Sequence, residues 1–238
     1  MEIQFAVAKI NKFLSGISGD AVEIVERPNG GLSAVLVDGN TSGTEGRTLS
    51  SSIVRKVLSL LGEGVRDGAA CRAVSDQLFA DYNGQKEVSL NLLSVDLETN
   101  TLVISRNNPA PVFVAQGESI DCLSAVALPI GSTRNIRPVI SEIQMQIGTT
   151  VVLYTDGVLN AGDKFNDPGI DICSFISGII EDQNPTAQEI ADALLKQAMR
   201  LDQYRPEDDM TVVVLRVMPP MEEKIRKMTI RYPLFDRS

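Results

Sequence analysis

The sequence predicts an α+β fold in which two antiparallel sheets, with pairs of helices on the outside, form a four-layer αββα sandwich. Segments with helical periodicity come in two sequential pairs, and a run of strand patterns separates the pairs. The connections between the strand patterns are short and contain Gly, Pro, Asn and Asp. A doubly wound parallel sheet needs strands that alternate with helices, and the sequence lacks that rhythm.

The chain begins with three expected strands, which occupy residues 3–8, 21–27 and 32–37. The segment Pro28-Asn29-Gly30-Gly31 predicts a tight turn between the second and the third strand. Asp20 and Asp38 are each nine residues from Asn29. An antiparallel hairpin therefore brings these two carboxylates together at its open end.

Two helix pairs and further strands follow. Apolar residues at helical spacing predict a first helix pair over residues 47–61 and 67–80. Strand patterns return at residues 88–95, 101–106, 112–115, 142–147 and 150–155. The second helix pair covers residues 171–180 and 186–199, the latter opened by a capping box of Thr186 and Glu189, and a last strand covers 210–217.

We expect one domain over residues 1–217 and a C-terminal extension over residues 218–238. The chain carries 22 Lys and Arg against 31 Asp and Glu, a net charge of -9, whereas the extension has five basic residues and three acidic ones. This reversal of sign is typical of a solvated or self-docking terminal segment, and an arm that docks on a partner is the alternative.

Composition excludes several classes of function. With no histidine, the chain has no Ser-His-Asp or Cys-His nucleophile and no His-ligated zinc. The acidic balance disfavours nucleic acid and anionic membranes as partners. We expect a cytoplasmic protein, because neither a basic-then-apolar leader nor an apolar run of roughly 18 residues is present. Cys71, Cys122 and Cys173 are scattered and odd in number, which predicts reduced thiols rather than a disulfide or a zinc site.

Aspartates gather where the expected strands begin and end. Asp38 and Asp156 end apolar strands directly before glycine, while Asp20 and the pair Asp208-Asp209 precede the start of strands. In an antiparallel sheet the end of one strand lies beside the start of its neighbour, so these carboxylates can converge on one edge. Two unit charges about 4 Å apart repel by roughly 4 kcal/mol at an effective dielectric constant of about 20. Such a cluster holds cations or stays partly protonated.

The expected ligands favour a hard divalent cation. Carboxylate oxygens without histidine or cysteine point to magnesium, manganese or calcium. The backbone at Gly39 can approach such an ion closely, so its carbonyl is an additional candidate ligand. A separate calcium loop around Asp163 is disfavoured because Lys164 and Pro168 break the required spacing. A glycosidase is disfavoured because the chain has no Trp and 5% aromatic residues.

The ordered motifs resemble those of the metal-dependent protein serine/threonine phosphatases of the type 2C class, in the bacterial sporulation-stage-II-E-like branch. Asn108-Pro109-Ala110-Pro111 is also similar to the small-residue and proline turn of that branch. The resemblance spans about residues 3 to 217. Its motifs are Ser18-Gly19-Asp20, Val37-Asp38-Gly39, Ala127-Leu128-Pro129-Ile130-Gly131, Tyr154-Thr155-Asp156-Gly157-Val158 and Asp208-Asp209-Met210-Thr211-Val212-Val213.

The resemblance implies two Mn²⁺ or Mg²⁺ ions and a water that attacks the phosphorus of phosphoserine or phosphothreonine in line. It assigns Asp38 as the bridge between the ions and Asp20 as a ligand or a holder of the water, which makes both catalytic. Gly39 would give its carbonyl to one ion, and Asp156 and Asp208 would complete the other. Asp209 and Gly157 would form a supporting shell.

The loop that follows Asp38 indicates which subfamily the chain resembles. The larger branch continues the second motif as Asp-x-x-Gly-His-Gly, whereas this chain reads Asp38-Gly39-Asn40-Thr41-Ser42-Gly43. That form is similar to the compact feedback phosphatases of the stressosome, which act on phosphorylated STAS-domain signalling proteins. A catalytically inactive pseudophosphatase that binds a signalling partner is the alternative. A monomer is compatible with the sequence, and Arg27, Arg47 and Arg205 all lie near the motifs as candidates to hold phosphate.

Overall fold

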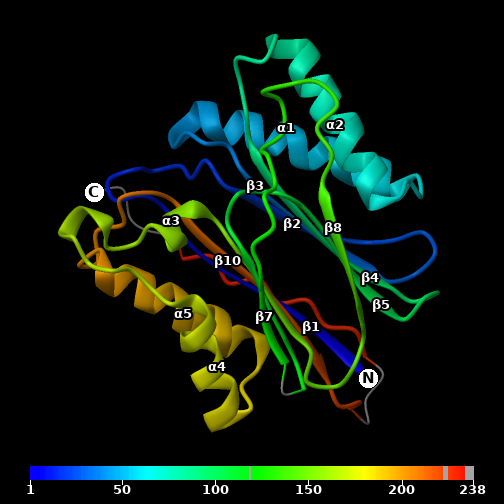
Figure 1. Ribbon diagram of the computed structural model, residues 1–238, viewed down its shortest axis with the longest axis vertical. Coiled ribbons are helices and arrows are strands. Elements are labelled where there is room, and N and C mark those ends of the chain that lie inside the picture. Colours follow the sequence, from blue (N-terminus) through cyan, green and yellow to red (C-terminus); the bar gives the residue numbers. More distant parts are fainter. Residues whose placement is uncertain (118, 222–224, 234–238) are drawn as a thin grey trace.

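The computed structural model describes residues 1–117, 119–221 and 225–233, apart from the side chains of residues 182 and 183. Over these residues the strands form two antiparallel five-stranded sheets (Figure 1). The first sheet has the order β1 (Glu2–Ile10), β10 (Met210–Met218), β9 (Thr150–Tyr154), β6 (Val112–Gln116) and β7 (Ser119–Leu123). The second has the order β2 (Ala21–Glu26), β3 (Leu32–Asp38), β4 (Ser89–Asp96), β5 (Thr101–Asn107) and β8 (Val139–Gln144).

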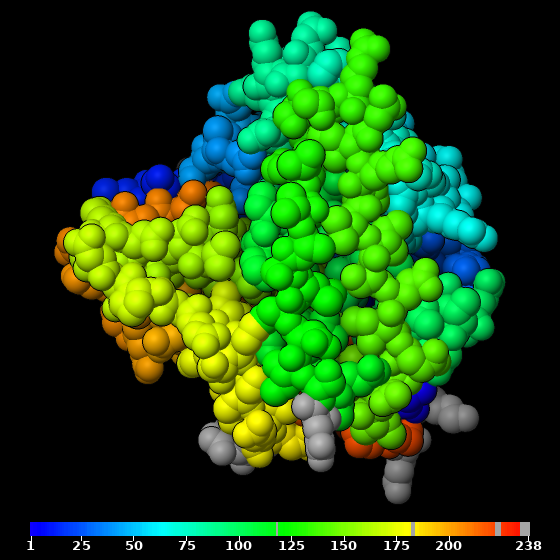
Figure 2. All heavy atoms as spheres, viewed as in Figure 1, coloured from blue at the N-terminus to red at the C-terminus, as the bar shows by residue number. Residues whose placement is uncertain are grey.

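Helices cover both outer faces, so the predicted four-layer αββα sandwich is confirmed (Figure 1). The helices α1 (Gly43–Gly62) and α2 (Asp67–Tyr82) pack on the second sheet, and α4 (Ile172–Gln183) and α5 (Ala187–Leu201) pack on the first. In the space-filling view, the green segments that contain β6, β7 and β8 run down the middle of this face, with the cyan of α2 on one side and the yellow of α4 on the other (Figure 2). None of the helices in the described ranges has the length and apolarity needed to cross a membrane.

Three apolar layers hold the sandwich together. One lies between α1–α2 and the second sheet, one between α4–α5 and the first sheet, and the third fills the space between the sheets. Because side chains of a strand alternate between its two faces, each central strand contributes one row to the layer between the sheets and one row to a helix-facing layer. In β3, for example, Leu36 faces the other sheet and Val37 faces the helices.

The predicted hairpin has the expected register, since Ala21 pairs with Val37 and the turn lies at residues 27–31. The strand predicted at residues 142–147 is wrong by three positions, because β8 spans Val139–Gln144 and pairs with β5. A turn in which the Thr149 N–H donates to the carbonyl of Gln146 directs the chain into β9. Three short elements were not predicted: β7, the four-residue helix α3 (Asp156–Leu159) and the 3₁₀ helix η1 (Asp163–Phe165).

A buried arginine forms hydrogen bonds that hold the proline turn between β5 and β6. The Ala110 N–H donates to Asn108 Oδ1 at 2.8 Å, which closes the turn. Arg106 is 2% exposed and donates to the carbonyls of Asn108, Ala110 and Ala125. These bonds satisfy a charged group that burial would otherwise penalise, and they tie the turn to the segment that leads to Ile130.

The last strand, β10, ends at Met218, one residue after its predicted end at residue 217. Residues 225–233 have neither helix nor strand and are exposed, and Arg226 donates to Glu26 at 3.1 Å. Part of the predicted charge count falls on Glu222, Glu223, Lys224, Asp236 and Arg237, which lie outside the described residues.

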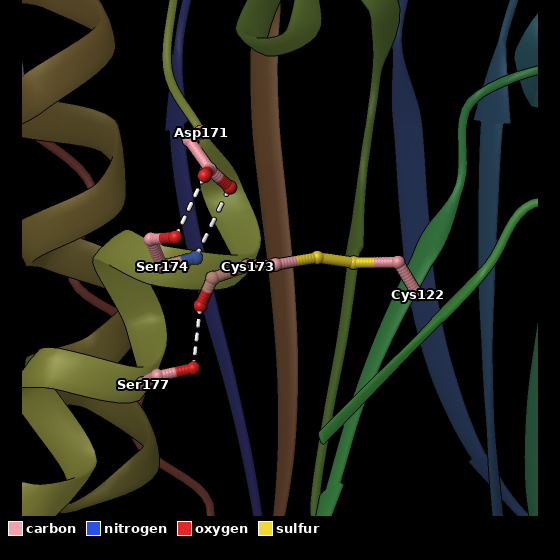
Figure 3. Close-up of a disulfide and its surroundings, with 5 residues drawn as sticks. All are labelled: Cys122, Asp171, Cys173, Ser174 and Ser177. Carbon is pink, nitrogen blue, oxygen red and sulfur yellow. Dashed lines mark hydrogen bonds between the residues drawn. A yellow bond between two sulfur atoms is a disulfide. The ribbon is translucent and has the colours of Figure 1, made fainter.

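The prediction of three reduced thiols is wrong for Cys122 and Cys173, which form a disulfide (Figure 3). Cys173 lies in α4 and Cys122 in β7, 51 positions away in sequence, and their Cα atoms are 6.7 Å apart, within the reach of a disulfide. Only the packing of α4 against β7 creates this proximity, so the sequence spacing gave no sign of it. Cys71 is free and buried, as expected.

We predict that the Cys122→Ser, Cys173→Ser double variant loses about 2–4 kcal/mol of unfolding free energy, because the disulfide limits the freedom of the unfolded chain. Urea denaturation under non-reducing conditions measures the loss. Dithiothreitol should lower the stability of the wild type toward that of the variant and leave the variant unchanged. Equal stability of wild type with and without dithiothreitol would contradict a structural disulfide.

Candidate metal centre

The candidate site lies where the apolar rows between the two sheets end in polar residues. In each case the two-residue alternation of a strand carries on from core side chains to one polar side chain: Val22 to Asp20, Leu36 to Asp38, Val7 to Lys9, Leu153 to Thr155 and Val213 to Thr211. These five residues therefore cap the inter-sheet core at one edge. Asp20 is 1% exposed and Asp38 is 8% exposed.

Asp20 is held by hydroxyl donors on its side chain and by cations on its backbone. Thr155 and Thr211 both donate to Asp20 Oδ2, at 3.1 and 2.5 Å. Lys9 Nζ and Arg47 Nη1 donate to the Asp20 carbonyl oxygen, at 2.6 and 2.9 Å. Because the threonines use Oδ2, Oδ1 is the carboxylate oxygen left for a cation. Burial raises the pKa of Asp20 to about 7, although Thr211 and Lys9 oppose that rise.

Asp38 and Asp156 are neighbouring carboxylates, and the negative charge of Asp156 acts on Asp38. Burial, together with the charges of Asp20 and Asp156, raises the pKa of Asp38 to about 8. The pKa of Asp156, the first residue of α3, is also raised, chiefly by burial and further by the charge of Asp208. The electrostatic neighbours thus form a chain, from Asp20 to Asp38 to Asp156 to Asp208. The structure therefore places each of the four predicted carboxylates within electrostatic range of the next in that order.

The adjacent residues Asp208 and Asp209 have different environments and different hydrogen-bond partners. Ser42 Oγ donates to Asp208 Oδ1 at 3.0 Å, and Asp208 is exposed toward a hollow of about 220 Å³ that Gly157 also lines. Asp209 is buried, and its two oxygens accept the backbone N–H groups of Lys12 and Gly19, at 2.9 and 2.8 Å. Asp209 therefore fixes a loop through these two bonds.

Glycines allow the backbone segments of the site to touch. A Cβ on Gly157 would lie 2.2 Å from the carbonyl oxygen of Asp209, and one on Gly39 would lie 2.7 Å from that of Gly46. A Cβ on Gly19 or Gly46 would meet the Thr41 carbonyl oxygen, at 2.1 and 1.6 Å. These contacts join the Asp38 loop to α1, and they join α3 to the start of β10. Gly157 and Gly39 are consequently needed for close approach, independently of any ligand role.

Sequence reasoning missed several of these residues. Lys9 and Gly46 were not singled out, and Thr155 and Thr211 were quoted within motifs without a role. The end of each alternating apolar row was the available signal for Lys9 and the two threonines. Among the three arginine candidates, only Arg47 contacts Asp20. Arg27 forms an ion pair with Asp67 at 2.8 Å, and the Arg205 guanidinium stacks on the Phe13 ring at 5.5 Å.

The donor set fits hard divalent cations. Its groups are carboxylate and carbonyl oxygens, and the raised pKa values of Asp20 and Asp38 record mutual repulsion and burial that a cation between them would offset. Across the described residues, no three Asp, Glu, His or Cys side chains form a group already arranged around one ion. The carboxylates lie as neighbouring pairs, so ligation needs side-chain adjustment.

The sequence matches the family model of stage II sporulation protein E (SpoIIE) over residues 28–218. It is 23% identical over 201 residues to the Stage II sporulation protein E of Bacillus subtilis (strain 168), a match that covers 84% of this chain and 24% of that protein. The chain thus spans about a quarter of the length of that curated relative.

Solved structures share the fold. The PP2C phosphatase domain of SpoIIE from Bacillus subtilis, with a fragment of its regulatory domain, has a TM-score of 0.78 and 22% identity over 91% of this chain and 64% of that one. RsbX in complex with magnesium has a TM-score of 0.67 and 16% identity over 90% and 94% of the two chains. The catalytic domain of the serine/threonine phosphatase PstP with two manganese ions has 0.67 and 15% over 91% and 99%.

We predict that the metal-free protein loses stability as the pH rises. Folding raises the pKa of Asp20 from 3.8 to about 7 and that of Asp38 from 3.8 to about 8. The contribution of these protonated groups to the free energy of unfolding is therefore fully present below the pKa of the unfolded state and is lost as the pH rises through the pKa values of the folded state. With chelator present, the melting temperature should fall between about pH 5.5 and about pH 8.5. The fall should be smaller in Asp38→Asn and unaltered in Asp192→Asn, a change of an exposed carboxylate on α5. Identical slopes for Asp38→Asn and wild type would contradict the raised pKa of Asp38.

We also predict opposite effects of alanine at two glycines. Gly157→Ala should lower the unfolding free energy by about 1–3 kcal/mol, because its methyl group overlaps the Asp209 carbonyl. Gly178→Ala, in α4 with nothing within 4 Å of the new methyl group, should raise it by about 0.5–1 kcal/mol. Urea denaturation measures both. A Gly157→Ala variant as stable as wild type would show that α3 and β10 do not need this close contact.

Proposed function

The chain belongs to the stage II sporulation protein E (SpoIIE) family, and we propose that it is a metal-dependent hydrolase of phosphoserine and phosphothreonine in proteins. The observation that carries the proposal is the chain of carboxylates from Asp20 to Asp208 at one edge of the sandwich. Family membership and the shared phosphatase fold support it.

The residues proposed to hold Mn²⁺ or Mg²⁺ are the four carboxylates and one carbonyl of that edge. They are Asp20, Asp38, Asp156, Asp208 and the carbonyl of Gly39. Magnesium in the structurally similar RsbX and two manganese ions in PstP support a proposal of two ions here. When bound, such ions supply Lewis-acid activation of water and offset the charge of the phosphoryl group.

The chain's own residues position these ligands. Thr155 and Thr211 orient the Asp20 carboxylate, while Lys9 and Arg47 fix its backbone from the other side. Gly157 and Gly39 allow the segments that carry Asp156 and Asp38 to close on their neighbours. Because the chain has no histidine, the departing serine or threonine oxygen takes its proton from another donor. We therefore expect modest turnover.

Phosphorylated STAS-domain proteins of a bacterial stressosome are the proposed substrates. The proposal rests on the loop Asp38-Gly39-Asn40-Thr41-Ser42-Gly43, which resembles that of compact feedback phosphatases. In this loop Ser42 contacts Asp208, and the Asn40 side chain donates to the carbonyl of Glu87 at 3.2 Å. A cytoplasmic location belongs to the same proposal.

We predict that the protein releases phosphate from a phosphoserine peptide in Mn²⁺ and that Asp38→Asn lowers kcat/KM by more than about 100-fold, because Asp38 would lose the charged carboxylate that is proposed to hold the ions. Malachite-green detection of phosphate measures the rate. Asp192→Asn, an exposed carboxylate on α5, serves as the matched control and should keep wild-type activity. Activity that persists in chelator, or equal activity in Asp38→Asn, would overturn the proposal.

The phosphate-release assay, together with a metal-binding measurement, distinguishes an active phosphatase from a pseudophosphatase. A phosphorylated STAS-domain protein from the same genome should be a better substrate than the peptide. Isothermal titration with Mn²⁺ tests the site independently of turnover. Metal binding by wild type, lost in Asp38→Asn, without any hydrolysis would identify a pseudophosphatase.

A further inference from the structure

A fixed loop borders the candidate metal centre. We call residues 12–19, which join β1 to β2 just before Asp20, the rim loop. The Asp209 carboxylate binds the backbone N–H groups at its two ends, Lys12 and Gly19. The Gly43 N–H donates to the Ile17 carbonyl at 3.1 Å, which ties the rim loop to the start of α1. The rim loop therefore keeps a defined position beside the carboxylates.

Large apolar side chains of this loop and its neighbour face solvent. In the rim loop, Phe13 is 47% exposed, Leu14 91% and Ile17 40%. Tyr204, which is 61% exposed, lies in the segment that precedes Asp208. This segment is bound to the rim loop, since the Phe13 N–H donates to the Pro206 carbonyl at 2.8 Å and the Arg205 guanidinium stacks on the Phe13 ring. These two connected segments thus expose four large apolar side chains beside the site.

Folding does not account for Leu14. The Ser15 N–H donates to the Lys12 carbonyl at 2.9 Å, which places Leu14 at the third position of a turn, with φ at 65°. Glycine or asparagine suits this left-handed conformation, whereas leucine is strained in it. The Leu14 side chain also gains no burial in return. Tyr204 shows the same combination, with φ at 59°. A binding role explains why bulky residues stand at these positions.

We propose that the rim loop and Tyr204 form the docking surface for the phosphoprotein substrate and contact apolar side chains that flank its phosphorylated residue. This inference rests on the proposed phosphatase function. The surface adjoins the carboxylates that are proposed to hold the metal ions, so a bound segment would reach both. Lys12 in the rim loop and Arg205 beside it place two cations next to the acidic Glu207 and Asp208, and these cations complement a phosphorylated segment.

The test uses two phosphoserine peptides that differ only in the residues flanking the phosphoserine, leucine in one and serine in the other. In Mn²⁺, wild type should favour the leucine peptide by about tenfold, both in kcat/KM and in Kd from fluorescence anisotropy. Leu14→Gly should reduce both preferences to about threefold or less. Its melting temperature should equal or exceed that of wild type, because glycine relieves the strained turn. The ratio of two peptides on one protein sample cancels differences in active fraction.

Ile147→Asn is the matched control, since Ile147 is 54% exposed and lies next to Gly148, which contacts the far end of β10. It should keep the full preference. A wild type without preference, or a Leu14→Gly variant that retains it, would overturn the docking surface. Hydrolysis of p-nitrophenyl phosphate by wild type reports the proposed function separately. A binding preference lost in Leu14→Gly, without any hydrolysis, would uphold the docking surface and reject the phosphatase.

Discussion

The burial of like charges at the end of a hydrophobic layer is the constraint on which the rest of this structure depends. Asp20 and Asp38 continue rows of side chains that fill the space between the sheets, and the hairpin register sets them at the same edge. Each raises the energy of ionising the other, because little water reaches either group. The protein accommodates them where the two sheets open, which is also where ligands from different strands meet.

The neighbouring residues follow from this constraint. Lys9 comes from β1 and Arg47 from α1, yet both donate to the carbonyl oxygen of Asp20. They bring positive charge close to this residue without occupying its side-chain carboxylate oxygens. Burial and the charge of Arg47 lower the pKa of Lys9. The negative charges of Asp20 and Asp209 oppose this lowering. Thr155 and Thr211 supply neutral donors. The glycines then matter for shape, because the segments approach to distances that a side chain would block.

The same arrangement would link the proposed hydrolysis to the proposed recognition of substrate. Asp209, next to Asp208 in sequence, turns away from the candidate ligands and holds both ends of the rim loop. A single pair of aspartates thus joins the proposed metal centre to the proposed docking surface. The lack of histidine leaves the chemistry to oxygen ligands, cations and water, so affinity for the protein substrate would contribute much of the specificity.

The sequence alone determined the fold class, the hairpin register and the identity of the carboxylates, because these depend on local periodicity, turn residues and the ends of strands. It also excluded histidine chemistry. Tertiary structure decided what depends on contacts between distant segments. Such contacts place Arg47, rather than Arg27 or Arg205, on the Asp20 carbonyl, bring Lys9 and Gly46 to the site, and pair Cys122 with Cys173. The predicted bounds of the edge strand β8 were wrong for a related reason. Pairing with β5 determines where this strand begins and ends more than the alternation of apolar residues in its own sequence does.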